Sequence, residues 1–177
     1  MVQSSFAVSK RSSLFKTVLQ AGLVAGTIDA LFAVADFLIT ARANPVIIFW
    51  YIASGAFGSA SSPKILINAN IITQTLYAIA GVAFHYFIAF AFICILILVF
   101  PLLKKWLHSF VIIAVLYGIF AWLVMNYIVL PLAFDGKMPL YTLKTMLSVS
   151  YLIIAIGFTG SLYAARFYKK AKPKINR

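Results

Sequence analysis

The chain has 177 residues, of which 64% are hydrophobic and only 10% are charged. A soluble domain of this length is nearer half apolar and about a quarter charged, so the composition excludes an ordinary soluble domain. The net charge of +12 does not indicate nucleic-acid binding, because the basic residues cluster at the ends of apolar segments and in residues 166–177. That distribution is typical of membrane topology signals and of attraction to anionic lipid.

Four apolar stretches follow one another along the chain, at about 15–40, 74–100, 108–132 and 141–165. Each is long enough to cross a hydrocarbon layer of ~30 Å, which takes roughly 20 residues. The first is too long for the apolar core of a signal peptide and contains two aspartates, so we interpret it as a retained helix. Turn signals separate the later stretches, namely Pro101 with Lys104-Lys105 and the segment 135–139. The sequence therefore predicts a single all-α domain over residues 1–177, with four transmembrane helices.

A short apolar segment lies between the first two spans, at about 45–58. Asn44-Pro45 predicts a helix start, with a capping residue followed by proline in the first turn. About thirteen apolar residues cover only ~20 Å as a helix, which favours a re-entrant or interfacial helix over a crossing. Ser62-Pro63 predicts a second helix start. A five-span arrangement, with 45–62 crossing the membrane, is the alternative.

The basic residues predict the orientation of the chain. With four spans, both termini lie on one side of the membrane, and a five-span arrangement would place the basic tail 166–177 on the opposite side. The side of the termini would hold eleven basic residues, namely Lys10, Arg11, Lys16, Lys104, Lys105, Arg166, Lys169, Lys170, Lys172, Lys174 and Arg177. The other side would hold four, namely Arg42, Lys64, Lys137 and Lys144. This bias predicts that both termini lie in the cytoplasm.

Two of the three acidic residues, Asp29 and Asp36, lie inside the first span. A carboxylate at this depth is costly, so it faces other protein or water and is a candidate for a working site. Both acids share a stripe with Gly22, Gly26 and Ala33, at spacings of three and four residues that place them on one helix face. The G-x-x-x-G of this stripe allows another helix to approach closely. We therefore expect the acids to face neighbouring helices.

The later spans also carry stripes of small and polar residues. The residues of these stripes are Gln74, Ala78, Gly81, His85 and Ala89 in the second span, Ala114, Gly118, Ala121 and Met125 in the third, and Ser150, Gly157, Ser161 and Ala164 in the fourth. Small residues allow close helix packing in membranes, so we expect these faces to turn inward.

Counting from the middle of each span predicts two polar layers. Asp29 and His85 lie near the midplane, while Asp36 and Asn126 lie further out, about 10 Å away at 1.5 Å per residue. The sequence thus predicts an intramembrane pocket made by Asp29, His85 and Asn126, with Asp36 as a further candidate. It leaves open whether Asp29 and His85 are charged, because burial and mutual attraction act in opposite directions.

Several of these residues have a plainer interpretation. The acids either bind a proton or cation, or form a hydrogen-bonded core that fixes helix register. Asn126 either contacts substrate or joins helices. Ser54, Gly55 and Gly58 form either an anion-binding nest near the outer surface or a simple turn. His85 is expected to be a structural partner, since the chain has too few His, Cys and Glu residues for a metal site.

No enzyme is predicted. The sequence has no nucleophile elbow, phosphate loop or H-E-x-x-H motif. The only cysteine, Cys94, lies within an apolar run and is expected to be inert. We predict neither a metal nor another cofactor.

Several strings resemble a family of small bacterial four-helix integral membrane proteins to which no activity is assigned. The strings are residues 25–29 (AGTID), 52–55 (IASG), 57–58 (FG), 84–89 (FHYFIA), 117–118 (YG), 124–129 (VMNYIV) and 131–132 (PL). The resemblance covers most of residues 20–132 and implies the architecture. It includes Asp29, Ser54, Gly55, His85 and Asn126, whereas Asp36 lies outside the strings.

Two functions from different classes follow. The first is a multi-pass inner-membrane protein whose polar pocket handles a proton, a cation or a small solute. The second is a non-catalytic accessory or assembly subunit of a membrane complex. The predicted partners are the bilayer, anionic headgroups at 166–177, and either a second copy through the G-x-x-x-G face or a membrane-complex partner.

Overall fold

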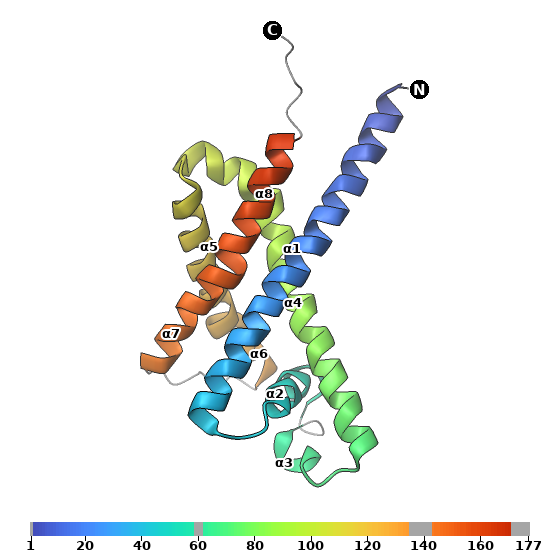
Figure 1. Cartoon of the computed structure of the whole chain (residues 1–177), viewed down its shortest axis with the longest axis vertical. Helices are drawn as coiled ribbons and strands as arrows, with labels where there is room; N and C mark the ends of the chain where they lie inside the picture. Colours follow the sequence, from blue (N-terminus) through green and yellow to red (C-terminus); the bar gives the residue numbers. More distant parts are fainter. Residues whose placement is uncertain (1, 59–61, 135–142, 171–177) are drawn as a thin grey trace.

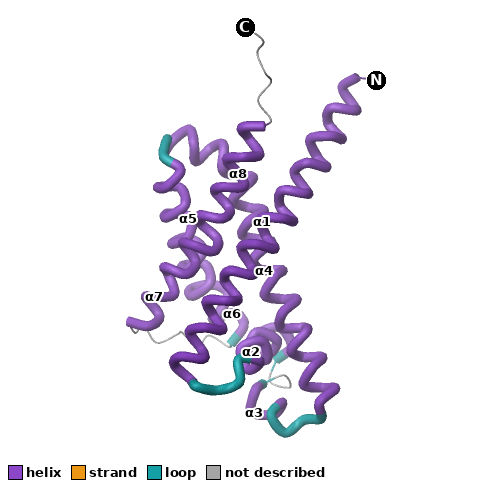
Figure 2. Tube along the Cα trace, in the orientation of Figure 1, coloured by secondary structure: helices purple, strands orange, loops and turns teal. Residues whose placement is uncertain are grey.

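The computed structural model describes residues 2–58, 62–134 and 143–170, with side chains over 13–58, 62–134 and 147–170. Every regular element in these segments is helical, and none is a strand (Figure 2). The predicted all-α membrane bundle is therefore confirmed.

Four helices are long and apolar enough to cross a membrane, over Ser13–Ala41, Ile71–Leu107, Phe110–Ala133 and Leu147–Lys170. The last two are each built from three consecutive elements, because a π-helical turn interrupts the α-helix. The elements of the four spans are α1 (Val2–Ala41), α4 (Ile71–Leu107), α5 (Phe110–Val124) with η2 (Met125–Val129) and α6 (Leu130–Ala133), and α7 (Leu143–Leu152) with η3 (Ile153–Phe158) and α8 (Thr159–Lys170). The start of α1, the end of α8 and the connection from α4 to α5 lie at the same end of the molecule (Figure 1).

The second span differs from its predicted bounds, because Pro101 does not end it. The helix continues to Leu107 and stops at His108, which has a φ of 54°. Proline has no N–H to donate to the carbonyl four residues earlier, which normally breaks a helix. Here the Tyr168 hydroxyl of α8 donates to the Ile97 carbonyl at 3.0 Å and so satisfies that acceptor. Partners from neighbouring helices make proline tolerable inside membrane helices.

The short apolar segment forms α2 (Val46–Phe57), and a second short helix, α3 (Pro63–Leu66), begins directly after Ser62. The N-cap position is Pro45 and not the predicted Asn44, but the Asn44 side-chain oxygen accepts a hydrogen bond from the Val46 N–H at 3.0 Å. With 12 residues, α2 is about 18 Å long and too short to cross a membrane. It is seen nearly end-on in Figure 1 and lies across the long helices, at the end opposite the chain termini.

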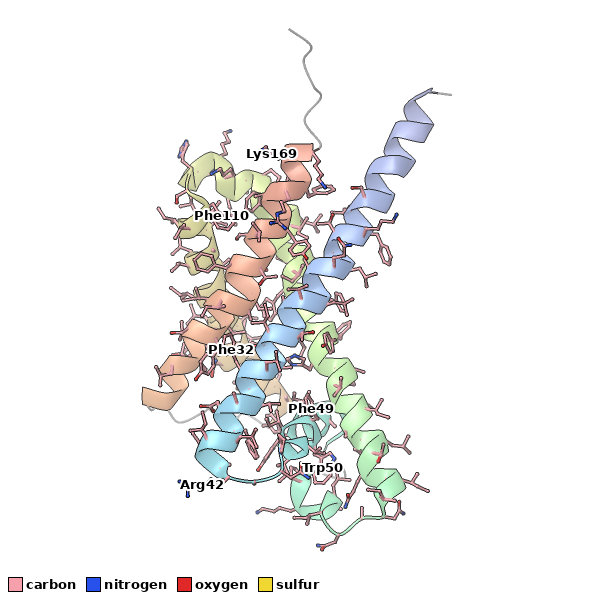
Figure 3. The ribbon with its side chains drawn as sticks, viewed as in Figure 1. Phe32, Arg42, Phe49, Trp50, Phe110 and Lys169 are labelled. Atoms are coloured by element: carbon pink, nitrogen blue, oxygen red, sulfur yellow. The ribbon has the colours of Figure 1, made fainter. Side chains whose placement is uncertain are left out.

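Glycine allows α2 to rest directly on α4. A Cβ added to Gly81 would lie 1.9 Å from the Phe49 carbonyl oxygen, so only glycine permits this approach. Next to this contact, the Trp50 indole donates to the Gln74 carbonyl at 3.0 Å. Figure 3 shows Phe49 and Trp50 on α2, between the lower parts of α1 and α4.

The G-x-x-x-G face of α1 is already occupied within the chain. The Phe90 ring covers Gly22, and Tyr86 and Ala89 of α4 cover Gly26. The packing of α1 against α4 therefore covers the Gly22 and Gly26 face through which we predicted self-association.

The stripe of the fourth span is only partly buried. Gly157, Ser161 and Ala164 are buried, whereas Ser150 is exposed. The π-helical η3 lies between Ser150 and the other three, and a π turn rotates the residues before it away from the face predicted with a 3.6-residue period. Ser150 was therefore wrongly placed on the inward face.

The start of α4 offers a stability prediction. The Asn70 side chain accepts from the Thr73 N–H at 2.9 Å and caps the helix. Asn70→Ala should lower the free energy of unfolding by about 1 kcal/mol. The loss is measured as a lower thermal midpoint in detergent. Asn70→Asp keeps the acceptor, so its thermal midpoint should remain close to that of the wild type. Equal midpoints for the two variants would contradict the capping role.

Candidate functional site

A cavity of about 450 Å³ lies inside the bundle, and all four spans and α2 contribute to its wall. Most of the side chains that line it are apolar. The polar ones are Asp29, Asp36, His85, Asn126, Ser148 and Tyr151. The cavity thus contains the two acids of the first span together with the polar residues that the sequence placed at similar depths on other helices.

His85 does not bond directly to Asp29. Its Nε2 lies 2.8 Å from the Gly26 carbonyl oxygen, and because a carbonyl only accepts, this nitrogen is the donor. Among the described residues no hydrogen bond or ion pair joins Asp29 to His85, although the two are near enough to interact electrostatically. His85 therefore ties α4 to α1 one turn away from the carboxylate, and the two residues share the cavity without a direct bond.

Asn126 lies in the π-helical segment η2 and is buried. Its amide nitrogen donates to the Trp122 carbonyl at 2.9 Å, within the same span. This bond stays inside one helix, so it does not join helices as the plainer interpretation supposed. π-helical turns of this kind occur frequently at functional sites.

Asp36 lies seven residues after Asp29 on α1 and lines the same cavity. Seven residues correspond to about 10 Å along the helix axis. The cavity therefore extends over both predicted polar layers.

Among the lining residues that the sequence analysis missed, three carry polar groups, namely Trp122, Ser148 and Tyr151. The Trp122 indole donates to the Ser148 hydroxyl at 2.9 Å and joins the third and fourth spans. Tyr151 stacks on Phe32 of α1, with ring centroids 5.0 Å apart and an angle of 14° between the rings. The signal for Trp122 was its position four residues before Asn126, on the same helix face.

Ser54 and Gly55 do not line this cavity. The Ser54 hydroxyl donates to the Tyr51 carbonyl at 2.8 Å, and the Gly58 N–H donates to the Ser54 carbonyl at 2.9 Å. These bonds close the last turn of α2 and use the groups that a nest would need for an anion. The geometry favours the simple turn. Gly55 instead lines a second cavity, which shares Ile48 and Ile52 of α2 with the first.

The chemistry of the cavity favours positive charge. Two carboxylates line it, while no lysine or arginine does so among the residues that the structure describes. Over the same residues, no group of three or more His, Cys, Asp or Glu is placed to hold a metal ion.

No family model, no curated protein and no solved structure matches the chain.

Proposed function

We propose that this membrane protein binds a proton or a small cationic solute in the cavity that Asp29 and Asp36 line. The observation that supports the proposal is two carboxylates in a mostly apolar wall without a lining lysine or arginine among the described residues. A carboxylate at this depth is costly unless something compensates its charge. For Asp29, a proton or a bound cation would supply that compensation.

We further propose that the chain lies in a bacterial inner membrane with both termini in the cytoplasm. Lys16, Lys104, Arg166 and Lys169 belong to the helix ends that lie together in Figure 1, whereas Arg42 lies at the opposite end of α1 (Figure 3). Positive charge favours the cytoplasmic side and the anionic headgroups there.

The alternative is an accessory subunit whose polar residues only hold the helices together. His85 is bonded to Gly26, and Trp122 is bonded to Ser148. These two bonds join the second span to the first and the third to the fourth. This alternative predicts that the cavity binds no solute.

Replacing Asp29 with asparagine separates the two functions. Asn keeps the size of the side chain and removes its charge, so Asp29→Asn should weaken the binding of methylammonium or Na⁺ at least tenfold, or about 1.4 kcal/mol. Binding is measured on purified protein as the rise in unfolding temperature with ligand concentration.

The matched control is Asp135→Asn, which removes the same charge from the one acidic residue that lies outside the apolar stretches of the sequence. It should leave binding unchanged. If neither cation stabilises the wild-type protein, and Asp29→Asn changes only its stability, the binding proposal is wrong and the accessory function is favoured.

A further inference from the structure

A second cavity of about 450 Å³ adjoins the first. The two cavities share part of their walls, through Phe37, Ile48, Ile52, Ile88, Met125 and Leu130. They are therefore neighbouring compartments that meet along these six apolar residues.

The two compartments differ sharply in polarity. The first contains Asp29 and Asp36. The second has Tyr51 as the one polar side chain among its lining residues. A bound metal ion or proton would need only the first compartment, because hard cations take several oxygen ligands and no apolar surface.

On the basis of the function proposed above, we propose that the occupant is an amphipathic organic cation, with its charged nitrogen in the compartment of Asp29 and its hydrocarbon body in the apolar compartment. Aromatic side chains line the first compartment, among them Phe92, Trp122 and Tyr151. Such rings attract organic ammonium groups and so favour this ligand class over a bare metal ion.

The length of the hydrocarbon is the variable that tests this inference. Each methylene moved from water into an apolar site should tighten binding on the order of fourfold. The affinity of the wild-type protein should therefore rise stepwise from methylammonium through butylammonium to hexylammonium. Free aqueous ligand is measured by equilibrium dialysis against the same detergent, so that uptake into micelles is subtracted.

Val129 lines the apolar compartment and not the compartment of Asp29, so Val129→Phe should fill the apolar compartment alone. It should leave methylammonium binding within twofold of wild type and flatten the rise with chain length. Ala56→Leu enlarges another residue that lines only this compartment, and it serves if Val129→Phe does not fold. The control is Ala83→Phe, a larger side chain at an exposed position that lines neither cavity.

The outcomes separate the two proposals. If methylammonium binds but longer chains bind no tighter, or bind equally in the filled variants, this inference is wrong and the proposed function stands. If hexanol binds as tightly as hexylammonium and Asp29→Asn does not matter, the cavity holds only a neutral chain and the inference is again wrong. If no ammonium ion binds, this inference is wrong, and the proposed function also fails if Na⁺ does not bind.

Discussion

Replacing Gly157 with alanine should lower the free energy of unfolding by at least about 3 kcal/mol, because overpacking a fixed backbone contact costs the upper part of the range for such changes. A Cβ at this position would lie 2.1 Å from the Ala114 carbonyl oxygen. The neighbouring contact is equally tight, since a Cβ on Gly118 would lie 2.4 Å from the Ile153 Cα. In both cases the obstacle is backbone, which cannot rotate away as a side chain can. The third and fourth spans would have to separate.

The matched control for Gly157→Ala is Gly160→Ala, three residues further along the same span. A Cβ there would meet the ends of two flexible side chains, with Leu96 Cδ2 at 2.5 Å and Ile93 Cδ1 at 2.8 Å. This variant should cost about 1 kcal/mol, the lower end of the same range. Both are compared by thermal midpoint and by the fraction of monodisperse protein recovered in detergent. Equal losses for the two variants would show that backbone contact is not what limits position 157.

Hydropathy and local capping chemistry were enough to predict the spans and the starts of the short helices. The spans are set by the lipid, which demands long apolar stretches whatever the tertiary packing. Asn44-Pro45 and Ser62-Pro63 act within one turn, so their effect is visible in the sequence. Asp29 and Asp36 share the cavity because a three- and four-residue spacing places them on one face of α1.

The remaining features depend on partners that no local pattern contains. Pro101 stays inside α4 because Tyr168, far along the chain, satisfies the Ile97 carbonyl. His85 bonds a backbone carbonyl of α1, and a pattern of side chains does not show which carbonyls are reachable. The π turns η2 and η3 each change the helical phase of their own span. In the fourth span, η3 explains why Ser150 lies outside the buried face.

Replacing Gly81 with alanine should release α2 from the bundle while leaving the four spans assembled. A Cβ there would lie 1.9 Å from the Phe49 carbonyl oxygen, so the two helices must move apart and the nearby bond from Trp50 to the Gln74 carbonyl should weaken. The backbone amides of α2 should then exchange with deuterium at least about tenfold faster, as expected for a locally opened element. The contact joins α4 to the short helix α2 and not to another span, so the thermal midpoint should fall less than in Gly157→Ala.

The loss of α2 also reaches the cavities, because Ile48 and Ile52 line both of them. With that shared wall displaced, Gly81→Ala should weaken hexylammonium binding at least tenfold, or about 1.4 kcal/mol. Asp29 and Asp36 stay in place on α1, so methylammonium binding should change less. The control is Ala83→Val, a larger change two residues away at an exposed position of the same helix, which should leave both amide exchange and binding at the wild-type level. Fast exchange in α2 with unchanged hexylammonium binding would show that α2 is no part of the binding site, whereas unchanged exchange would show that Gly81 does not hold α2.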